Sequence, residues 1–114
     1  MQHFEARSAP VEHQALGPGY SGPQTATNAD LFASRDGVLQ VGVWTYAGTL
    51  VSTNPGDNHQ IWIVLEGSAE VEMGEQTVRA GIGDVIVLEA PYGPKTLVAS
   101  SDFRAIWIAT KAAV

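Results

Sequence analysis

The sequence contains no cysteine. Disulfide bonds, thiolate metal ligands and a cysteine nucleophile are therefore excluded. Basic residues are also scarce: six lysines and arginines oppose twelve acids, and the formal net charge is −6. The basic residues are scattered and form no cluster that would neutralise phosphates. We therefore expect no nucleic-acid partner.

Long apolar runs are missing as well. The first residues, MQHFEARSAP, do not combine a basic region with an apolar stretch, so they do not resemble a signal peptide. No apolar run approaches the length that crosses a membrane. From these absences we expect a cytoplasmic protein without a membrane partner.

Charged residues make up only 16% of the chain, whereas hydrophobic residues make up 45%. This composition favours a folded chain over a disordered one. A chain of 114 residues has the size of one domain and can bury one core. The low charge indicates that a partner subunit covers part of the surface, and it predicts a homodimer.

Residues 1–28 are polar and rich in glycine and proline, which predicts an irregular N-terminal arm. Its stretch APVEHQAL is a candidate strand at the edge of its own sheet or of a neighbour's. The next stretch, NADLFASRDG, allows either a short helical turn capped by Asn28 or Asp30, or a strand. Residues 29–114 are predicted to form the single folded domain.

Short segments rich in β-branched and aromatic residues recur from Val38 onwards, with Gly and Pro turns between them. SAEVEM and TVRA, joined by GEQ, predict a β-hairpin over residues 68–80. No long helical period interrupts the series. The pattern predicts an all-β fold, a sandwich or barrel of the jelly-roll type. The segments are VLQVGVWTYAG, TLVST, QIWIVLEG, SAEVEM, TVRA, VIVLEA, TLVAS and FRAIWIAT.

The stretch IVLEGSAEVEMGEQTVRAGIGDVIVLEAP resembles the cupin superfamily. In that family a strand ending in Leu-Glu-Gly leads into a hairpin, and Gly-Asp opens an apolar strand that runs into proline and glycine. The preceding VGVWTYAG resembles the small single-domain cupins of the ethanolamine-utilisation and ureidoglycine-aminohydrolase-like branch. The resemblance spans roughly Val38 to Lys111. It implies a cupin jelly-roll barrel, also called a double-stranded β-helix, that follows the arm.

Metal-binding cupins hold their ion with histidines and a glutamate, and the resemblance shows where these would lie. Alignment on the glycines of the two motifs puts the family's ligand positions at or near Asn54, Gly56, Gln60 and either Pro94 or Thr96. Amides, a backbone position and a hydroxyl are poor ligands for iron, manganese or zinc. We therefore expect no cofactor, and a divalent metal held through His59 is the alternative.

His59 lies one position before Gln60. Neighbours in a strand point to opposite faces, so His59 faces outward if Gln60 and Trp62 line the barrel. A bulge at the barrel rim would reverse this for His59. A His59 that faces the pocket is a candidate catalytic base, because histidines titrate near neutral pH. Gln60 and Trp62 are either substrate contacts or ordinary core residues.

Other aromatic residues also lie on expected strands. If Trp44, Tyr46 and Trp107 point inward, they shape an aromatic cavity for a flat or apolar ligand. If they point outward, they form a dimer interface. Ordinary core packing is the third interpretation.

The loop after VIVLEA holds further candidates. Glu89 is a candidate catalytic base or metal ligand, or a solvated charge at the rim. Tyr92 and Thr96 are candidate substrate contacts. Lys95 is either a contact to an anionic substrate or an exposed lysine.

Arg104 shares a face of the last expected strand with Ile106 and Ile108. An arginine among apolar neighbours needs a partner. Glu70 or Glu72 would serve as a structural partner, and a substrate carboxylate would serve as a functional one.

Three functions remain open at this point. The first is a metal-independent enzyme acting on a small polar metabolite, with His59 as the base, similar to the sugar epimerases of the superfamily. The second is a non-catalytic small-molecule binding module with Trp44 in its pocket. The third is a metalloenzyme with a reduced ligand set, such as His59 with Glu89. The expected homodimer would form by exchange of the N-terminal arm.

Overall fold

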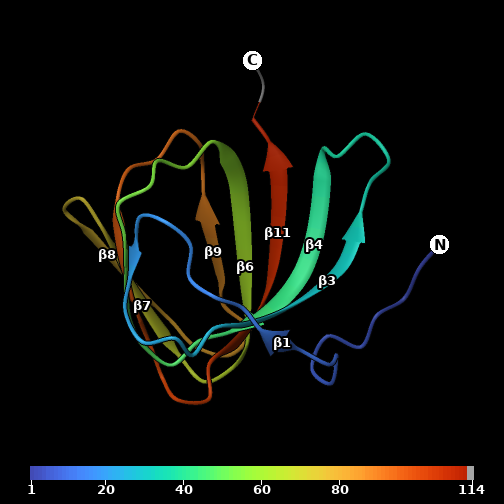
Figure 1. Ribbon diagram of the computed structural model, residues 1–114, viewed down its shortest axis with the longest axis horizontal. Coiled ribbons are helices and arrows are strands. Elements are labelled where there is room, and N and C mark those ends of the chain that lie inside the picture. Colours follow the sequence, from blue (N-terminus) through green and yellow to red (C-terminus); the bar gives the residue numbers. More distant parts are fainter. Residues whose placement is uncertain (113–114) are drawn as a thin grey trace.

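The computed structural model describes residues 1–112, which form eleven β-strands and no helix (Figure 1). It follows that no helix in this part of the chain has the length and apolar character needed to cross a membrane. The strands are β1 Glu12–His13, β2 Tyr20–Ser21, β3 Thr27–Ala33, β4 Leu39–Thr45, β5 Gly48–Ser52, β6 Asn58–Glu66, β7 Ala69–Met73, β8 Gln76–Ala80, β9 Val85–Leu88, β10 Lys95–Ala99 and β11 Arg104–Lys111.

The strands form two antiparallel sheets that face each other. The six-stranded sheet has the order β1-β3-β4-β11-β6-β9, and the five-stranded sheet has the order β2-β5-β10-β7-β8. Figure 1 shows the larger sheet from β9 across to β3, with β7 and β8 of the smaller sheet beside it. Within residues 1–112 the strand pairing does not close the sheets into one barrel. The predicted all-β jelly-roll fold is confirmed in this two-sheet form.

The local predictions for single strands hold. Each apolar segment expected to be a strand contains one, and β7 pairs with β8 as the hairpin predicted over residues 68–80. The ambiguous stretch NADLFASRDG contributes to a strand, β3, rather than to a helical turn. Its backbone pairs with both β1 and β4, and these ladders provide the hydrogen bonds that a helix would have supplied.

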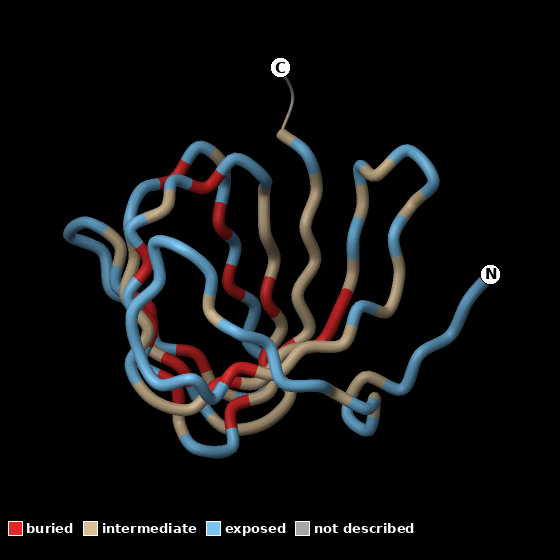
Figure 2. Tube along the Cα trace, viewed as in Figure 1, coloured by how far each residue is buried: buried red, intermediate tan, exposed pale blue. Residues whose placement is uncertain are grey.

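The N-terminal arm crosses from one sheet to the other. β1 pairs with β3 at the edge of the six-stranded sheet, and β2 pairs with β5 at the edge of the five-stranded sheet. The arm therefore adds strands to the sheets of its own chain, which was one of the two alternatives that the sequence predicted for APVEHQAL. Figure 2 shows that most of the arm is exposed. Short strand pairings and side-chain hydrogen bonds to its backbone therefore position the arm, more than burial does.

The core lies where the inner faces of the two sheets meet. Tyr46, Phe103, Leu97 and Val64 are each at most 2% exposed. Trp62 and Val64 alternate with less buried residues along β6, because successive side chains of a strand point to opposite faces. The far ends of β3 and β4 contain no buried residue, as Figure 2 shows. The sheets are thus tightly packed at one end and leave room for a pocket toward the other.

Candidate functional site

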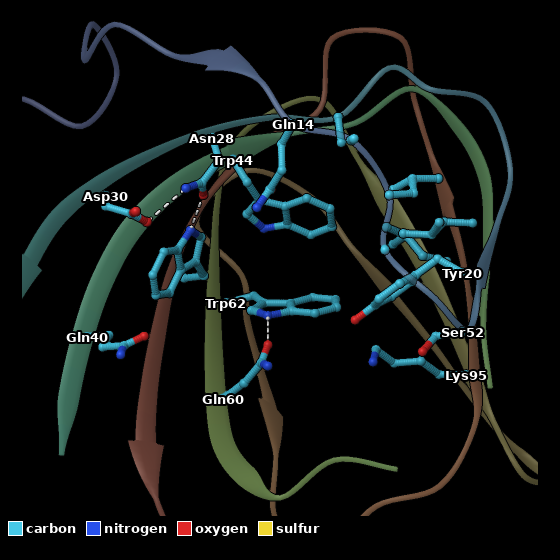
Figure 3. A pocket seen from close by; sticks show the side chains of 17 residues that line it. Gln14, Tyr20, Asn28, Asp30, Gln40, Trp44, Ser52, Gln60, Trp62 and Lys95 are labelled. Carbon is cyan, nitrogen blue, oxygen red and sulfur yellow. Dashed lines mark hydrogen bonds between the residues drawn. The ribbon is translucent and has the colours of Figure 1, made fainter. Parts of the chain in front are cut away.

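A pocket of about 430 Å³ lies between the inner faces of the sheets. Small-molecule sites commonly have volumes of roughly 300–1,000 Å³. Both sheets and the N-terminal arm contribute to its walls (Figure 3). The lining residues are Gln14, Ala15, Leu16, Gly17, Tyr20, Ala26, Asn28, Asp30, Gln40, Trp44, Leu50, Ser52, Gln60, Trp62, Lys95, Leu97 and Trp107.

The six-stranded sheet contributes an aromatic wall. The ring centroids of Trp44 on β4 and Trp62 on β6 are 5.3 Å apart, and the rings meet edge to face at 62°. Aromatic pairs favour this arrangement. The Trp62 Nε1 donates a hydrogen bond to Gln60 Oε1 at 2.9 Å, which holds the amide against the edge of the indole (Figure 3). The Trp44 Nε1 is buried and has no hydrogen-bond partner within residues 1–112.

A chain of hydrogen bonds fixes the third indole of this wall. Trp107 Nε1 donates to Asn28 Oδ1 at 2.8 Å, and Asn28 Nδ2 donates to Asp30 Oδ1 at 2.8 Å. Gly42 lies opposite Trp107 in the pairing of β4 with β11. A Cβ atom at position 42 would collide with the indole. Glycine therefore allows the Trp107 ring to lie against β4.

The five-stranded sheet contributes a polar row. Ser52 on β5 lies opposite Tyr20 on β2 and opposite Lys95 on β10. Residues that oppose each other in a ladder share a face, and all three line the pocket. Figure 3 shows the Tyr20 hydroxyl and the Lys95 amino group directed toward Trp62. Ser52 is 2% exposed, and its Oγ has no hydrogen-bond partner in the described part of the chain.

Lys95 carries the positive charge of the pocket. Arg79 with Glu70 is the one ion pair within residues 1–112, so Lys95 has no acidic partner there. Its Nζ lies 5.2 Å from the centroid of the Tyr92 ring, which is a cation–π distance. Burial lowers the pKa of Lys95, because the ammonium loses hydration. Burial also raises the pKa of Tyr92, with smaller contributions from Tyr20 and Asp57.

The two residues predicted as catalytic groups do not line the pocket. His59 follows the alternation of β6 and takes the face opposite to that of Gln60. Its Nδ1 accepts a hydrogen bond from the Ala90 backbone N–H at 2.9 Å. The pairing of β6 is irregular only near Arg104, so no bulge turns His59 inward. Glu89 is exposed after the end of β9.

The predicted substrate contacts divide into two groups. Gln60, Trp62 and Trp44 line the pocket together, whereas Tyr92, Thr96 and Arg104 do not. Tyr92 belongs to the buried core and meets the pocket only through its contact with Lys95. Thr96 follows Lys95 on β10, and the alternation of the strand turns it to the outer face.

Arg104 holds the N-terminal arm. Its Nε and Nη2 donate to the Ala6 carbonyl at 3.1 and 2.9 Å, and Nη2 also donates to the Ala9 carbonyl at 2.6 Å. The prediction of Glu70 or Glu72 as its structural partner is wrong. Glu70 lies on the other sheet, where it pairs with Arg79 across the β7–β8 hairpin. The arginine satisfies its donors with backbone carbonyls instead.

Several residues of the pocket were not predicted from the sequence. For Asn28 and Asp30 the sequence offers a helix cap or a place in a strand but no role in a site, yet they line the pocket as alternate residues of β3. Tyr20 lies in the arm and Ser52 at the end of a short strand, where no local pattern marks either residue. Only the register between strands brings them to Lys95.

The side chains of the pocket do not fit a transition-metal ion. The lining contains no histidine or glutamate, and its one carboxylate, Asp30, accepts a hydrogen bond from Asn28. Iron, manganese and zinc prefer sets of imidazole and carboxylate ligands. Residues 1–112 contain no group of three or more His, Cys, Asp or Glu that could hold an ion. The Lys95 ammonium would also repel a cation at this position.

No protein-family model matches the sequence, and no curated protein matches it either. Solved structures do resemble the fold. The cupin domain of Schizosaccharomyces pombe Cnp3 has a TM-score of 0.68 at 16% identity, over 96% of this chain and 74% of that one. KdgF from a Halomonas species has a TM-score of 0.67 at 19% identity, over 98% and 96% of the two chains.

A third similar structure is a protein from Salmonella typhimurium assigned as ethanolamine utilization protein Q. It has a TM-score of 0.64 at 21% identity, over 77% of this chain and 71% of that one. At such identities the likeness shows the fold alone. The chain is a small domain with the cupin fold, as its sequence motifs predicted.

Proposed function

We propose that the protein binds a small organic metabolite between its two sheets, without a transition metal. The observation that carries this proposal is a pair of buried polar atoms, Trp44 Nε1 and Ser52 Oγ, which lack partners within residues 1–112 and belong to residues that line opposite walls of the pocket. Buried polar groups are nearly always hydrogen-bonded, and an unsatisfied one costs about 1–3 kcal/mol. A ligand with polar groups at both walls would supply the missing partners.

The remaining lining supports the same function. Trp44 and Trp62 offer flat apolar surfaces, and Gln40, Gln60 and Asn28 offer amide donors and acceptors. A mostly apolar cavity with a few convergent polar groups is typical of small-molecule sites. The aromatic wall would contribute binding energy, and the amides would orient the ligand.

The geometry favours binding over catalysis. A catalytic base must come within hydrogen-bonding reach of the proton that it removes. His59 and Glu89 lie outside the lining, and the ionisable residues within it are Tyr20, Asp30 and Lys95. Asp30 already accepts a hydrogen bond from Asn28. A binding module therefore fits the pocket better than an enzyme with His59 as its base or a metalloenzyme built on His59 and Glu89.

The test uses protein that has been treated with a chelator. Aromatic acids, sugar acids, neutral sugars and nucleosides would be screened by thermal unfolding, and compounds that stabilise the protein would be titrated by calorimetry. We expect at least one class to bind. Trp44→Phe keeps an aromatic ring but removes Nε1 and part of the indole, so it should weaken that binding about tenfold and lower the stability of the free protein, which thermal unfolding measures separately.

Thr96→Ala is the matched control, because Thr96 lies on β10 beside Lys95 but points away from the pocket. It should leave the affinity unchanged. The proposal fails if no class of compound binds the chelated protein. It also fails if binding requires a metal that the chelator removes.

A further inference from the structure

We infer that the ligand carries a carboxylate, and that Lys95, Ser52 and Tyr20 form the subsite for it. The inference rests on the proposed function, because it names the chemical class of the molecule that the same pocket binds. It also assigns a task to the polar row of the five-stranded sheet, as distinct from the aromatic wall opposite.

The register of three strands builds this subsite. Tyr20, Ser52 and Lys95 are consecutive cross-strand neighbours on β2, β5 and β10. Neighbouring strands are about 4.8 Å apart, so the three side chains start close together on one side of the pocket. A carboxylate has two oxygens that accept hydrogen bonds from adjacent donors. Bonds from an ammonium to a carboxylate are roughly twice as strong as neutral ones.

The donors of the row are not used elsewhere in the described structure. Lys95 makes no ion pair within residues 1–112, and its ammonium lies over the face of the Tyr92 ring. Ser52 Oγ is buried without a partner. A half-buried ammonium without a counter-charge is costly, and an anion that enters the pocket removes that cost. Asp30 does not serve as the counter-charge, because it lies on the opposite sheet and accepts from Asn28.

The charge of the site favours a carboxylate over a phosphate. Lys95 is the only lysine or arginine among the residues that line the pocket. Phosphate sites usually combine several cationic groups, or use the N-terminus of a helix, and residues 1–112 contain no helix. The protein has a net charge of −6, which disfavours a dianion more than a monoanion. One ammonium with two hydroxyls matches one carboxylate.

The experiment compares probes that differ only in this group. Phenylacetate would be titrated against phenylacetamide, and glucuronate against glucuronamide, with phenyl phosphate and inorganic phosphate as the alternative anions. The proteins are the wild type, Lys95→Met and Lys111→Met. Lys111 is the other lysine of the chain, and it is exposed and outside the pocket lining.

We expect the wild type to bind at least one acid about 10–100-fold more tightly than its amide. Lys95→Met should lose this preference, and Lys111→Met should keep it. Lys95→Met should also fold, because methionine preserves the length of the side chain and removes a partly buried charge. Thermal unfolding of the free variant checks this point.

The possible failures are distinct. Equal affinity of the wild type for acid and amide overturns the carboxylate subsite and leaves the proposed function in place. Tighter binding of phenyl phosphate or inorganic phosphate than of either acid overturns the choice of carboxylate. If no acid, amide or phosphate binds the wild type, the proposed function falls together with the inference.

Ser52→Ala separates a role in binding from a structural role. Because Ser52 Oγ has no partner within residues 1–112, its loss should not lower the stability of the free protein. It should weaken acid binding about 3–10-fold, since a hydrogen bond to a charged group is lost. Unchanged acid affinity in Ser52→Ala would remove Ser52 from the subsite, and reduced stability of the free variant would assign it a structural role instead.

Discussion

The two faces of the six-stranded sheet come from alternate residues of the same strands, yet they differ in kind. The inner face presents indoles and amides, among them Trp62, Trp107 and Gln60. The outer face presents aliphatic side chains. Two rows run in register across β4, β11, β6 and β9, namely Val43, Ile106, Ile63 and Val85, and then Val41, Ile108, Ile61 and Val87.

The outer face is the more apolar of the two, yet it lies outside the main core cluster. Within the described residues, none of these aliphatic side chains belongs to the main buried cluster or packs against it. Val85 and Val87 are 56% and 64% exposed. Val43 at the other end of its row is 0% exposed, and the residues between are partly buried, so this apolar face is open to solvent mainly along β9. An exposed apolar patch of this kind is typical of an interaction surface. The sequence predicted a homodimer by exchange of the arm, whose strands pair here within their own chain. We propose instead that a homodimer forms at this face, because the two rows contain no acid to repel a second chain of net charge −6.

Hydrophobicity alone does not determine which face of this sheet is internal. Both faces are apolar enough to be buried, so the pattern of alternation defines two faces without saying which one is internal. The inner face carries large rings with polar atoms, which fill space and still leave hydrogen-bonding groups for a ligand. The two outer rows contain only branched aliphatic side chains, which suit packing against another flat surface.

The largest expected effect comes from truncating one side chain on each face. Trp62 is 5% exposed and packs against Trp44, so Trp62→Ala should lower the free energy of unfolding by about 3–5 kcal/mol. Ile63→Ala, the next residue on the outer face, should cost about 1–2 kcal/mol, because Ile63 is only partly buried. Urea denaturation at low protein concentration measures both, and equal losses would contradict the contrast between the faces.

The second prediction places a charge on the outer face. Val87→Lys should weaken self-association about tenfold or more, because a dimer would bury an unpaired ammonium. Light scattering over a concentration series measures this. Val38→Lys is the control, because Val38 is also exposed but lies outside the two rows. A wild type that stays monomeric at all concentrations would refute the dimer.

The third prediction uses two neighbours on β6 that point to opposite faces. Gln60→Ala should weaken ligand binding several-fold, because the amide lines the pocket. His59→Ala should leave ligand affinity unchanged and lower stability by about 1 kcal/mol, because the Ala90 N–H loses its acceptor. Calorimetry and denaturation measure the two quantities. A loss of ligand affinity in His59→Ala would show that His59 contributes to ligand binding.

The smallest expected effect is a pH dependence that belongs to the inner side of the pocket. The pKa of Lys95 in the folded protein lies below its ordinary value of 10.5, so between these two values the unfolded chain holds more protons. Stability of the free protein should therefore rise with pH in that interval, and this rise should be absent in Lys95→Met.

Two tyrosines act in the opposite direction. Burial raises the pKa of Tyr46 and of Tyr92 above 10.0, so their contribution to stability falls as the pH passes 10.0. For this reason the difference between wild type and Lys95→Met is the quantity to measure, since both proteins retain these tyrosines. An identical pH profile for the two proteins would show that Lys95 is not buried in the free protein.

The sequence was sufficient for the strands from β4 to β11, where the local pattern is strong. Alternation, turn glycines and the paired motifs predicted these strands, the hairpin and the jelly roll, and alternation alone set His59 and Gln60 on opposite faces. In the arm and at β3 the pattern left the structure open. It was not sufficient for contacts between distant segments. Strand register, which no local pattern encodes, brings together Tyr20, Ser52 and Lys95. The hydrogen bonds from Arg104 to the arm likewise join distant segments.

The hydrogen bonds between Arg104 and the arm have a consequence for folding during translation. Ala6 and Arg104 are 98 positions apart, so the arm leaves the ribosome long before its anchor is synthesised. The walls of the pocket show the same span, because Gln14 comes from the arm and Trp107 from β11. A nascent chain therefore has no complete pocket until β11 has been translated, and ligand capture cannot precede that point.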